Sequence, residues 1–169
     1  VLLFGECSIL ILLSLLFITY LFGGLKIEAK DKLSGSVQEL QLYDNTYALI
    51  IGIDNYPYLG INQQLNYAVS DARAVSKSMQ DNFMFNEIKT LYNEQATRNN
   101  IQKELSNFRN TDKEDGIFIF FAGHGFTENT PDGDLGYIIP YDGNINEIEM
   151  YKNISMNELK DILKPIPAK

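Results

Sequence analysis

The stretch that decides the fold is G-I-F-I-F-F-A-G-H-G-F, residues 116–126. Six apolar residues, 117–122, lead directly to His124, which is the only histidine of the chain. A short continuous apolar run is typical of a strand that is buried on both faces of a parallel sheet. We therefore expect a buried strand here, with His124 just beyond its carboxyl end.

Other parts of residues 47–169 carry strand or helix patterns. Residues 47–53, Y-A-L-I-I-G-I, and residues 88–92, I-K-T-L-Y, predict two more strands, and G-Y-I-I-P at 136–140 predicts a short one. An amphipathic helix is predicted by apolar residues at three- and four-residue intervals, namely Leu65, Ala68, Val69, Ala72, Val75 and Met79.

Two later helices are predicted from capping residues. Thr97 is a candidate N-cap for a helix whose apolar face is Ile101, Leu105 and Phe108. Ser155 and Glu158 predict a capping box at the start of the last helix. Alternating strands and helices predict an α/β fold with right-handed crossovers, in which functional groups gather beyond the carboxyl ends of the strands.

The composition suits one globular domain and limits the range of partners. The 169 residues carry a net charge of -8, with 45% hydrophobic and 21% charged residues. An acidic surface repels phosphate backbones, so we expect no nucleic-acid partner. The single cysteine, Cys7, excludes an internal disulfide and a cysteine-based metal site.

The first 46 residues differ from the rest of the chain. Residues 7–25 are uncharged and hydrophobic, and they are long enough for a membrane span or for the core of a secretory signal. We expect residues 1–25 to be a membrane anchor or a cleaved signal peptide, with a soluble core helix as the remaining alternative. Residues 26–46 predict a polar linker. The protein is accordingly expected to be membrane-anchored or secreted.

His124 is a candidate catalytic residue because glycines flank it. An imidazole can move a proton near neutral pH. Gly123 and Gly125 permit a sharp turn, leave the ring accessible and expose a backbone N–H that can face a developing oxyanion. The alternative is a packed or solvated histidine of structural importance only. The chain contains no G-x-S-x-G motif, so a serine hydrolase of the α/β type is not expected.

Four segments, in this order, resemble the caspase and metacaspase group of cysteine peptidases. They are Y-A-L-I-I-G-I-D-N-Y, A-V-S-D-A-R-A-V, I-F-I-F-F-A-G-H-G and G-Y-I-I-P-Y-D. The resemblance covers roughly residues 47–169. It implies a caspase-like three-layer α/β/α sandwich with a mostly parallel sheet, and a cysteine-type endopeptidase that acts on a polypeptide substrate.

The resemblance also implies roles for two neighbouring residues. His124 would be the general acid and base of a Cys–His dyad, and the backbone N–H of Gly125 would help to bind the oxyanion. In this family the cysteine stands at the end of the next strand, in a D-x-C sequence that these residues do not contain. We therefore expect residues 47–169 to be a C-terminally incomplete peptidase domain that is inactive by itself.

Asp71 is a candidate substrate-binding residue. Metacaspases and paracaspases have an acidic residue here, which lines the pocket for a basic P1 side chain. The resemblance therefore implies cleavage after Arg or Lys. The alternative is a solvated carboxylate in the first turn of a helix, where the helix dipole favours negative charge.

Three acidic residues after the strand at 117–122 raise the question of a metal ion. Acidic residues beside Pro and Gly are ordinary turn residues, so we expect no cofactor. The alternative is a calcium site formed by Asp132, Asp134 and Asp142, because the resemblance extends to metacaspases and some of them need that ion.

Two alternative functions stay open at this point. One is a catalytically dead caspase-fold interaction module whose full-length form has no nucleophilic cysteine. The other is an unrelated α/β ligand-binding domain in which His124 is incidental.

Overall fold

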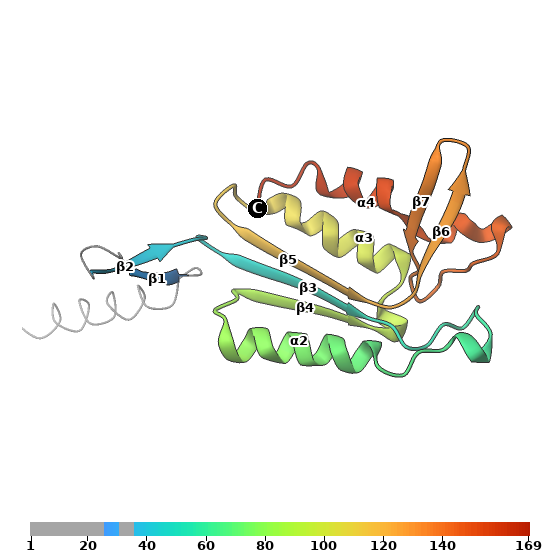
Figure 1. The fold of residues 1–169 in the computed structure, drawn as a ribbon, viewed down its shortest axis with the longest axis horizontal. Coiled ribbons are helices and arrows are strands. Elements are labelled where there is room, and N and C mark those ends of the chain that lie inside the picture. Colours follow the sequence, from blue (N-terminus) through green and yellow to red (C-terminus); the bar gives the residue numbers. More distant parts are fainter. Residues whose placement is uncertain (1–25, 31–35) are drawn as a thin grey trace, which may run out of the picture.

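The computed structural model describes residues 26–30 and 36–169, and a parallel sheet lies at its centre (Figure 1). β3 (Thr46–Gly52) lies between β4 (Glu87–Tyr92) and β5 (Gly116–Ala122), and it pairs in parallel with both. The strands predicted at residues 47–53, 88–92 and 117–122 are thereby confirmed. Burial on both faces is wrong for the strand before His124, because β5 lies at the edge of the described sheet and most of its side chains are half-buried.

β3 is buried on both faces, which explains its unbroken apolar sequence. Ala48 and Ile50 form one hydrophobic cluster with Ala72, while Leu49 and Ile51 belong to a second cluster on the opposite face. Each of these five side chains is at most 1% exposed. Successive side chains of a strand point to opposite faces, so a strand covered on both sides must be apolar at every position.

Helices cover both faces of this sheet, giving three layers (Figure 1). α2 (Ala68–Asn82) lies against one face, and a Cβ at Gly52 would be only 2.6 Å from Ala72 Cβ. α3 (Arg98–Asn107) and α4 (Met156–Leu163) lie on the other face. The glycine in β3 thus lets α2 pack directly on the strand.

The helix boundaries confirm most of the capping predictions. Thr97 caps α3, since its side chain accepts a hydrogen bond from Asn100 N at 3.2 Å. Ser155 caps α4 by accepting from Glu158 N at 3.1 Å. The Glu158 carboxylate does not complete the capping box, because it binds the Arg98 guanidinium at 2.7 Å instead. The acidic side chain therefore ties α4 to α3.

The first predicted helix is shorter than expected. α2 begins at Ala68, and Leu65 lies in the preceding loop, where its N–H donates to Asp54 O at 2.8 Å. That backbone bond closes the loop after β3, so Leu65 is apolar because it packs on the core from a loop.

A second, antiparallel sheet follows β5. β6 (Gly125–Thr130) pairs with β7 (Gly133–Ile138), and β7 pairs with the short β8 (Ile154–Ser155). The predicted strand at 136–140 corresponds to the second half of β7. β6 was not predicted, because its sequence, G-F-T-E-N-T, lacks a continuous apolar run.

The segment predicted as a polar linker contains regular structure. β1 (Lys26–Lys30) and β2 (Val37–Gln41) form an antiparallel pair within it. The alternating sequences K-I-E-A-K and V-Q-E-L-Q are compatible with strands. The predicted anchor or signal peptide, residues 1–25, lies outside the described residues. Within the described ranges, no helix combines the length and hydrophobicity that a membrane span requires.

Four short 3₁₀ helices lie in the loops of the described residues. They are Ile61–Gln63, Asn93–Gln95, Phe108–Asn110 and Glu147–Lys152.

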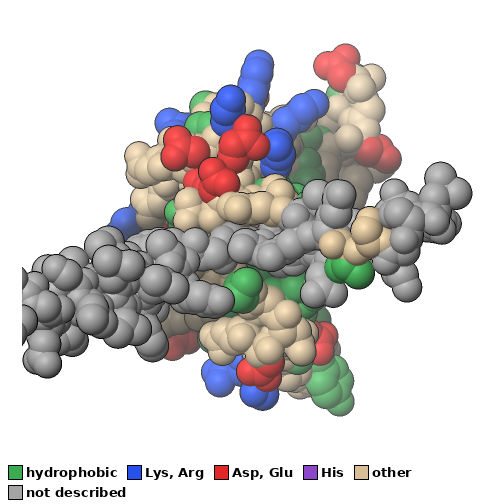
Figure 2. All heavy atoms as spheres, turned by 90° about the vertical axis from the view of Figure 1, so that its left-hand side faces the viewer, with side chains coloured by type: hydrophobic (Ala, Val, Ile, Leu, Met, Phe, Trp, Pro, Cys, Tyr) green, Lys and Arg blue, Asp and Glu red, His purple; other side chains and the backbone are tan. Residues whose placement is uncertain are grey.

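The surface at the amino ends of the parallel strands carries acidic and basic side chains side by side (Figure 2). The charged side chains drawn in colour on that face therefore form no patch of a single sign.

Candidate active site

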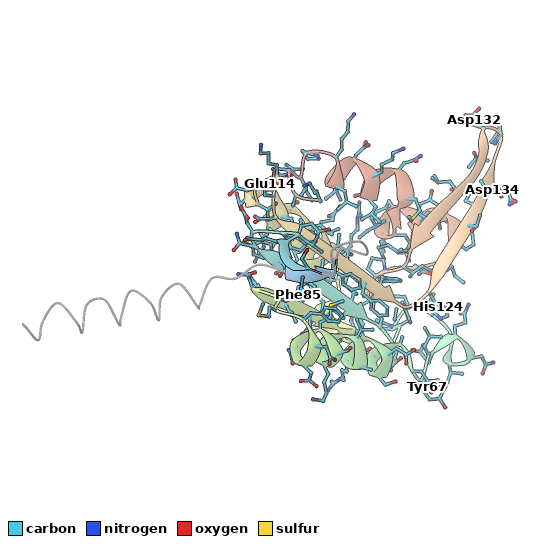
Figure 3. All side chains as sticks on the ribbon, turned by 60° about the vertical axis from the view of Figure 1, so that its left-hand side comes forward. Tyr67, Phe85, Glu114, His124, Asp132 and Asp134 are labelled. Atoms are coloured by element: carbon cyan, nitrogen blue, oxygen red, sulfur yellow. The ribbon has the colours of Figure 1, made fainter. Side chains whose placement is uncertain are left out.

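His124 lies in the short connection between the parallel and the antiparallel sheet. β5 ends at Ala122 and β6 begins at Gly125, which places the imidazole at the carboxyl end of the parallel sheet (Figure 3). The side chain is half-buried. Its position is the one expected from the sequence, and the structure adds the residues that hold it.

Tyr56, in the loop after β3, contacts both the backbone and the ring of His124. Its hydroxyl oxygen accepts a hydrogen bond from His124 N at 2.7 Å, and the two ring centroids lie 4.8 Å apart at an interplanar angle of 48°. A Cβ at Gly123 would approach the Tyr56 hydroxyl oxygen to 2.5 Å. The glycine before the histidine is thus required by close approach of the tyrosine.

The environment of Tyr56 keeps its hydroxyl group protonated. The side chain is 1% exposed, and this burial raises the pKa of Tyr56 to about 12. The hydrogen bond from His124 N–H opposes the rise in pKa, and the nearby Asp54 carboxylate adds to it. Tyr56 is therefore a neutral phenol near pH 7 and serves as a fixed support for the imidazole.

The backbone of Gln63 orients the His124 ring. His124 Nε2 lies 2.6 Å from Gln63 O. A carbonyl oxygen only accepts, so Nε2 must carry the proton of this bond. In the neutral ring Nδ1 then keeps its lone pair, and it has no hydrogen-bond partner in the part of the chain that the structure describes. The ring is thus held in a single tautomer with one nitrogen available as a base.

Two amide side chains fix the loop that carries Tyr56. Gln64 accepts from Tyr56 N at 2.7 Å and donates to Tyr56 O at 3.0 Å. Asn93, at the end of β4, accepts from the backbone N–H groups of Asp54 at 2.9 Å and Asn55 at 3.1 Å. Asn93 has a φ of 44°, a left-handed conformation that Asn tolerates better than most residues. The loops after β3 and β4 are therefore joined beside His124.

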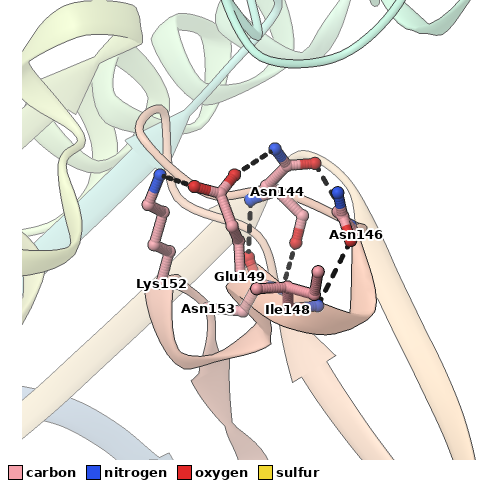
Figure 4. Close-up of polar contacts among 6 residues, drawn as sticks. All are labelled: Asn144, Asn146, Ile148, Glu149, Lys152 and Asn153. Atoms are coloured by element: carbon pink, nitrogen blue, oxygen red, sulfur yellow. Dashed lines mark hydrogen bonds and ion pairs between the residues drawn. The ribbon is translucent and has the colours of Figure 1, made fainter.

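The loop between β7 and β8 supports the same region from outside. Asn153 donates to Asn144 O at 2.6 Å, and Glu149 accepts from Asn144 Nδ2 and from Lys152 Nζ (Figure 4). The hydrogen bond from Lys152 is the main cause that lowers the pKa of Glu149 below its usual range, and the hydrogen bond from Asn144 adds to it. Lys152 Nζ also lies 5.1 Å from the ring centroid of Tyr58, which belongs to the Tyr56 loop.

The strand register leaves the backbone N–H of Gly125 available. Gly125 is opposite Ile138, and the bond from Ile139 N to His124 O shows that this pair is of the non-hydrogen-bonded kind. The N–H of Gly125 therefore points away from β7, and the residue is exposed. The donor that the resemblance assigns to an oxyanion is directly adjacent to His124.

Asp71 lies apart from these residues. It is exposed in the first turn of α2, and its carboxylate makes no hydrogen bond or ion pair with any described residue. α2 starts at the same end of the sheet as His124 (Figure 1). The structure thus places Asp71 on the same side of the molecule as the imidazole without bringing the two into contact.

The three acidic residues of the calcium interpretation do not form a site. Asp132 and Asp134 are exposed at the tip of the β6–β7 hairpin (Figure 3). Asp142 instead accepts a hydrogen bond from Arg98 N at 2.7 Å, at the start of α3. Within residues 26–30 and 36–169, no group of three or more His, Cys, Asp or Glu side chains is arranged to hold a metal ion. The residues therefore do not fit a calcium ion.

Sequence reasoning missed the residues that support His124. Tyr56 and Gln64 lie in the loop after β3, and Gln63 acts through its backbone carbonyl. Every residue has a backbone carbonyl, so the sequence cannot show which one binds the imidazole. Gln64 and Asn93 stand among other polar residues, so no sequence pattern distinguishes their amides.

Comparisons with known proteins show which family the chain resembles in sequence and which solved structure it resembles in fold. The peptidase C14 caspase-domain model matches residues 45–168. Protein GSU0716 from Geobacter sulfurreducens has a similar crystal structure, with a TM-score of 0.60 and 19% sequence identity over 74% of this chain. The match spans 47% of the Geobacter chain, and at this identity it shows the fold alone.

No curated protein matches this chain in sequence. The family match rests on more than half of the chain and includes β3, β4, β5 and the turn that carries His124. Members of the family are peptidases and hence hydrolases. The chain belongs to the caspase domain family.

Proposed function

We propose that the full-length protein is a caspase-like cysteine endopeptidase in which His124 is the general acid and base. The orientation of the imidazole carries this proposal. Because Nε2 is bound to the Gln63 carbonyl, Nδ1 holds a lone pair that can accept a proton. A structural histidine needs no such free nitrogen at the carboxyl end of a sheet.

The residues present support a definite sequence of proton transfers. Nδ1 of His124 takes the proton of a cysteine thiol, and the Gln63 carbonyl dipole stabilises the resulting imidazolium. The thiolate attacks the scissile carbonyl, and the N–H of Gly125 stabilises the oxyanion. The imidazolium then returns the proton to the leaving amine, and water hydrolyses the acyl-thioester, which restores the thiol.

The edge of β5 supports a location for the thiol. Lys169 N donates to Asp115 O at 3.0 Å, and Ile117 N donates to Lys169 O at 2.8 Å. These two bonds form one rung of a parallel ladder opposite Gly116. A chain continuing in this register would reach the level of His124 after about eight more residues, because strands advance equally in a parallel pair. We place the cysteine nucleophile there.

Asp71 supports a preference for basic P1 side chains. It is an exposed carboxylate without an internal partner in the described structure, at the end of the molecule where His124 lies. Loss of that charge should weaken selection for Arg and Lys. Asp81, an exposed carboxylate that pairs with Lys77 at 2.7 Å in the last turn of the same helix, is a control for loss of charge at the far end of α2.

The experiment uses the full-length protein and fluorogenic peptides that end in Arg, Lys or Asp. Replacing His124 with Ala should lower kcat by about 10²–10⁴-fold, the usual contribution of a general acid or base. Asp71→Asn should reduce kcat/KM for Arg and Lys peptides and leave the Asp peptide unaffected. Asp81→Asn should change neither.

Two outcomes would reject the proposal in different ways. A folded wild-type protein with no activity on any peptide supports the catalytically dead interaction module. Cleavage that persists in folded His124→Ala protein shows that another residue supplies the base. Urea unfolding of each variant separates these results from simple loss of the fold.

A further inference from the structure

β6 presents a free hydrogen-bonding edge that starts at the candidate oxyanion donor. In the order β6-β7-β8, β6 pairs with β7 and with no other strand of the described chain. Gly125, Thr127 and Asn129 are opposite Ile138, Gly136 and Asp134 in non-hydrogen-bonded pairs, since the register alternates from the bond between Ile139 N and His124 O. Their N–H and C=O groups therefore point away from β7.

This edge lacks the features that usually protect an exposed strand. Protected edges carry charged side chains, Lys above all, or Pro, or a bulge that interrupts the pairing. β6 contains no Lys or Pro, its one charged residue, Glu128, accepts a hydrogen bond from the Tyr137 hydroxyl of β7 at 2.8 Å, and its six pairs with β7 run without a bulge. Thr127 and Asn129 are both exposed, and the Thr127 side chain is small. The edge can therefore accept another strand.

The chemistry of the edge selects its ligand. Alternating N–H and C=O groups, spaced about 6.7 Å apart along a strand, are matched by another extended polypeptide backbone. The first such N–H, that of Gly125, directly follows His124. A peptide whose scissile carbonyl binds there has a carbonyl two residues away at the level of Thr127.

We propose that the open edge of β6 binds the polypeptide substrate as an added strand, with the backbone N–H of Thr127 as the second hydrogen-bond donor after Gly125. This inference rests on the proposed peptidase function and names how the same site holds its substrate. The edge recognises the main chain, so it contributes affinity for extended peptides of any sequence.

The test removes one N–H from the edge of the full-length protein. Thr127→Pro deletes that donor and leaves the β6–β7 ladder intact, because Thr127 N does not take part in it. Thr127→Ala loses the same side chain and keeps the N–H. Each protein is assayed on a short peptide that ends at the scissile bond and on peptides extended by two residues on either side.

Wild type and Thr127→Ala should both cleave one extended peptide better than the short one. Thr127→Pro should lose about three- to tenfold in kcat/KM on that extended peptide alone, the equivalent of one hydrogen bond. An extended peptide in which an ester oxygen replaces the N–H that faces the Thr127 carbonyl should lose a similar factor on wild-type enzyme, because the same edge residue then accepts one hydrogen bond fewer. That second measurement does not depend on how well the proline variant folds.

Several results would overturn the proposal. An unchanged ratio of extended to short substrate in folded Thr127→Pro, or an equal loss in Thr127→Ala, excludes the Thr127 N–H as a donor. A concentration-dependent dimer that only Thr127→Pro abolishes in sedimentation would assign the edge to a second copy of the chain. Cleavage of the short peptide reports separately on the peptidase function, whose failure would also remove this inference.

Discussion

The two sheets of the described structure differ in how they use their faces and edges. The parallel sheet is covered by helices on both faces, and Leu49 in β3 is fully buried. The antiparallel sheet extends from it, and its first strand alternates between exposed and half-buried residues. One sheet thus supplies stability, while the other exposes backbone groups that a partner can bind.

His124 lies where the two sheets meet, and this position gives it both properties. β5 and the hydrogen bond from His124 N–H to the Tyr56 hydroxyl fix its backbone, and the Gln63 carbonyl orients its ring. Gly125, the next residue, is the first residue of the exposed β6–β7 hairpin. A proton-transfer group needs a rigid support, and a substrate needs an accessible surface, so the boundary between the sheets suits a catalytic residue.

The largest expected effect compares one leucine from each sheet. Leu49→Ala should lower the free energy of unfolding by about 2–5 kcal/mol, because it leaves a cavity in the main core. Leu135→Ala, in the half-buried β7, should cost about 1 kcal/mol or less, because less apolar surface is lost. Urea denaturation measures both. Equal losses would show that the two sheets contribute alike to stability.

A smaller effect is expected at the boundary, from the titration of Tyr56. Its pKa is about 12 in the folded protein and near 10 when unfolded, so the folded state retains the proton to higher pH. This contribution is fully present below pH 10 and should be lost as pH rises to 12, by at most about 2–3 kcal/mol. Tyr56→Phe should remove that part of the pH dependence.

Urea unfolding between about pH 8 and 12, which is roughly two units on either side of the unfolded pKa, gives the difference curve for Tyr56. Other tyrosines, including Tyr47 and Tyr137, also have raised pKa values. Subtracting the variant from the wild type cancels their contributions. Parallel curves for the two proteins would show that the Tyr56 hydroxyl is not buried against His124.

The smallest expected effect concerns the tip of the hairpin. Gly133 has a φ of 116° with open space around it, so a side chain there meets backbone strain and no clash. Gly133→Ala should cost about 1 kcal/mol, while Asp132→Ala beside it should cost less than about 0.5 kcal/mol. Hydrogen exchange of Gly133→Ala should show reduced protection of the backbone N–H groups in β6 and β7 only. Loss of protection in β3 would mean that the hairpin supports the parallel sheet.

The parallel strands and the helix caps were predictable because their signals are local. A strand buried on both faces must be apolar throughout, and Thr97 caps α3 within three residues of its partner. The position of His124 beyond β5 follows from the same run of residues. Its catalytic role, that of Gly125 and the substrate role of Asp71 stay predictions that the proposed assays test.

Other features depend on residues far apart in the chain. Glu158 is spaced for a capping box, yet it pairs with Arg98, which lies 60 residues earlier in the sequence. β6 has no apolar run, and it forms because β7 folds back on it through a tight turn at Gly133. Such pairings follow from the packing of α3 on α4 and of hairpin strands on each other.

The sequence by itself determined which segments are buried, because burial demands apolar side chains at spacings set by backbone geometry. It also determined that an imidazole follows an apolar strand. Only the tertiary structure decided which nitrogen of that imidazole is free and which strand edge is open. Both depend on backbone N–H and C=O groups, and since every residue carries them, their pairing leaves no trace in the residue types.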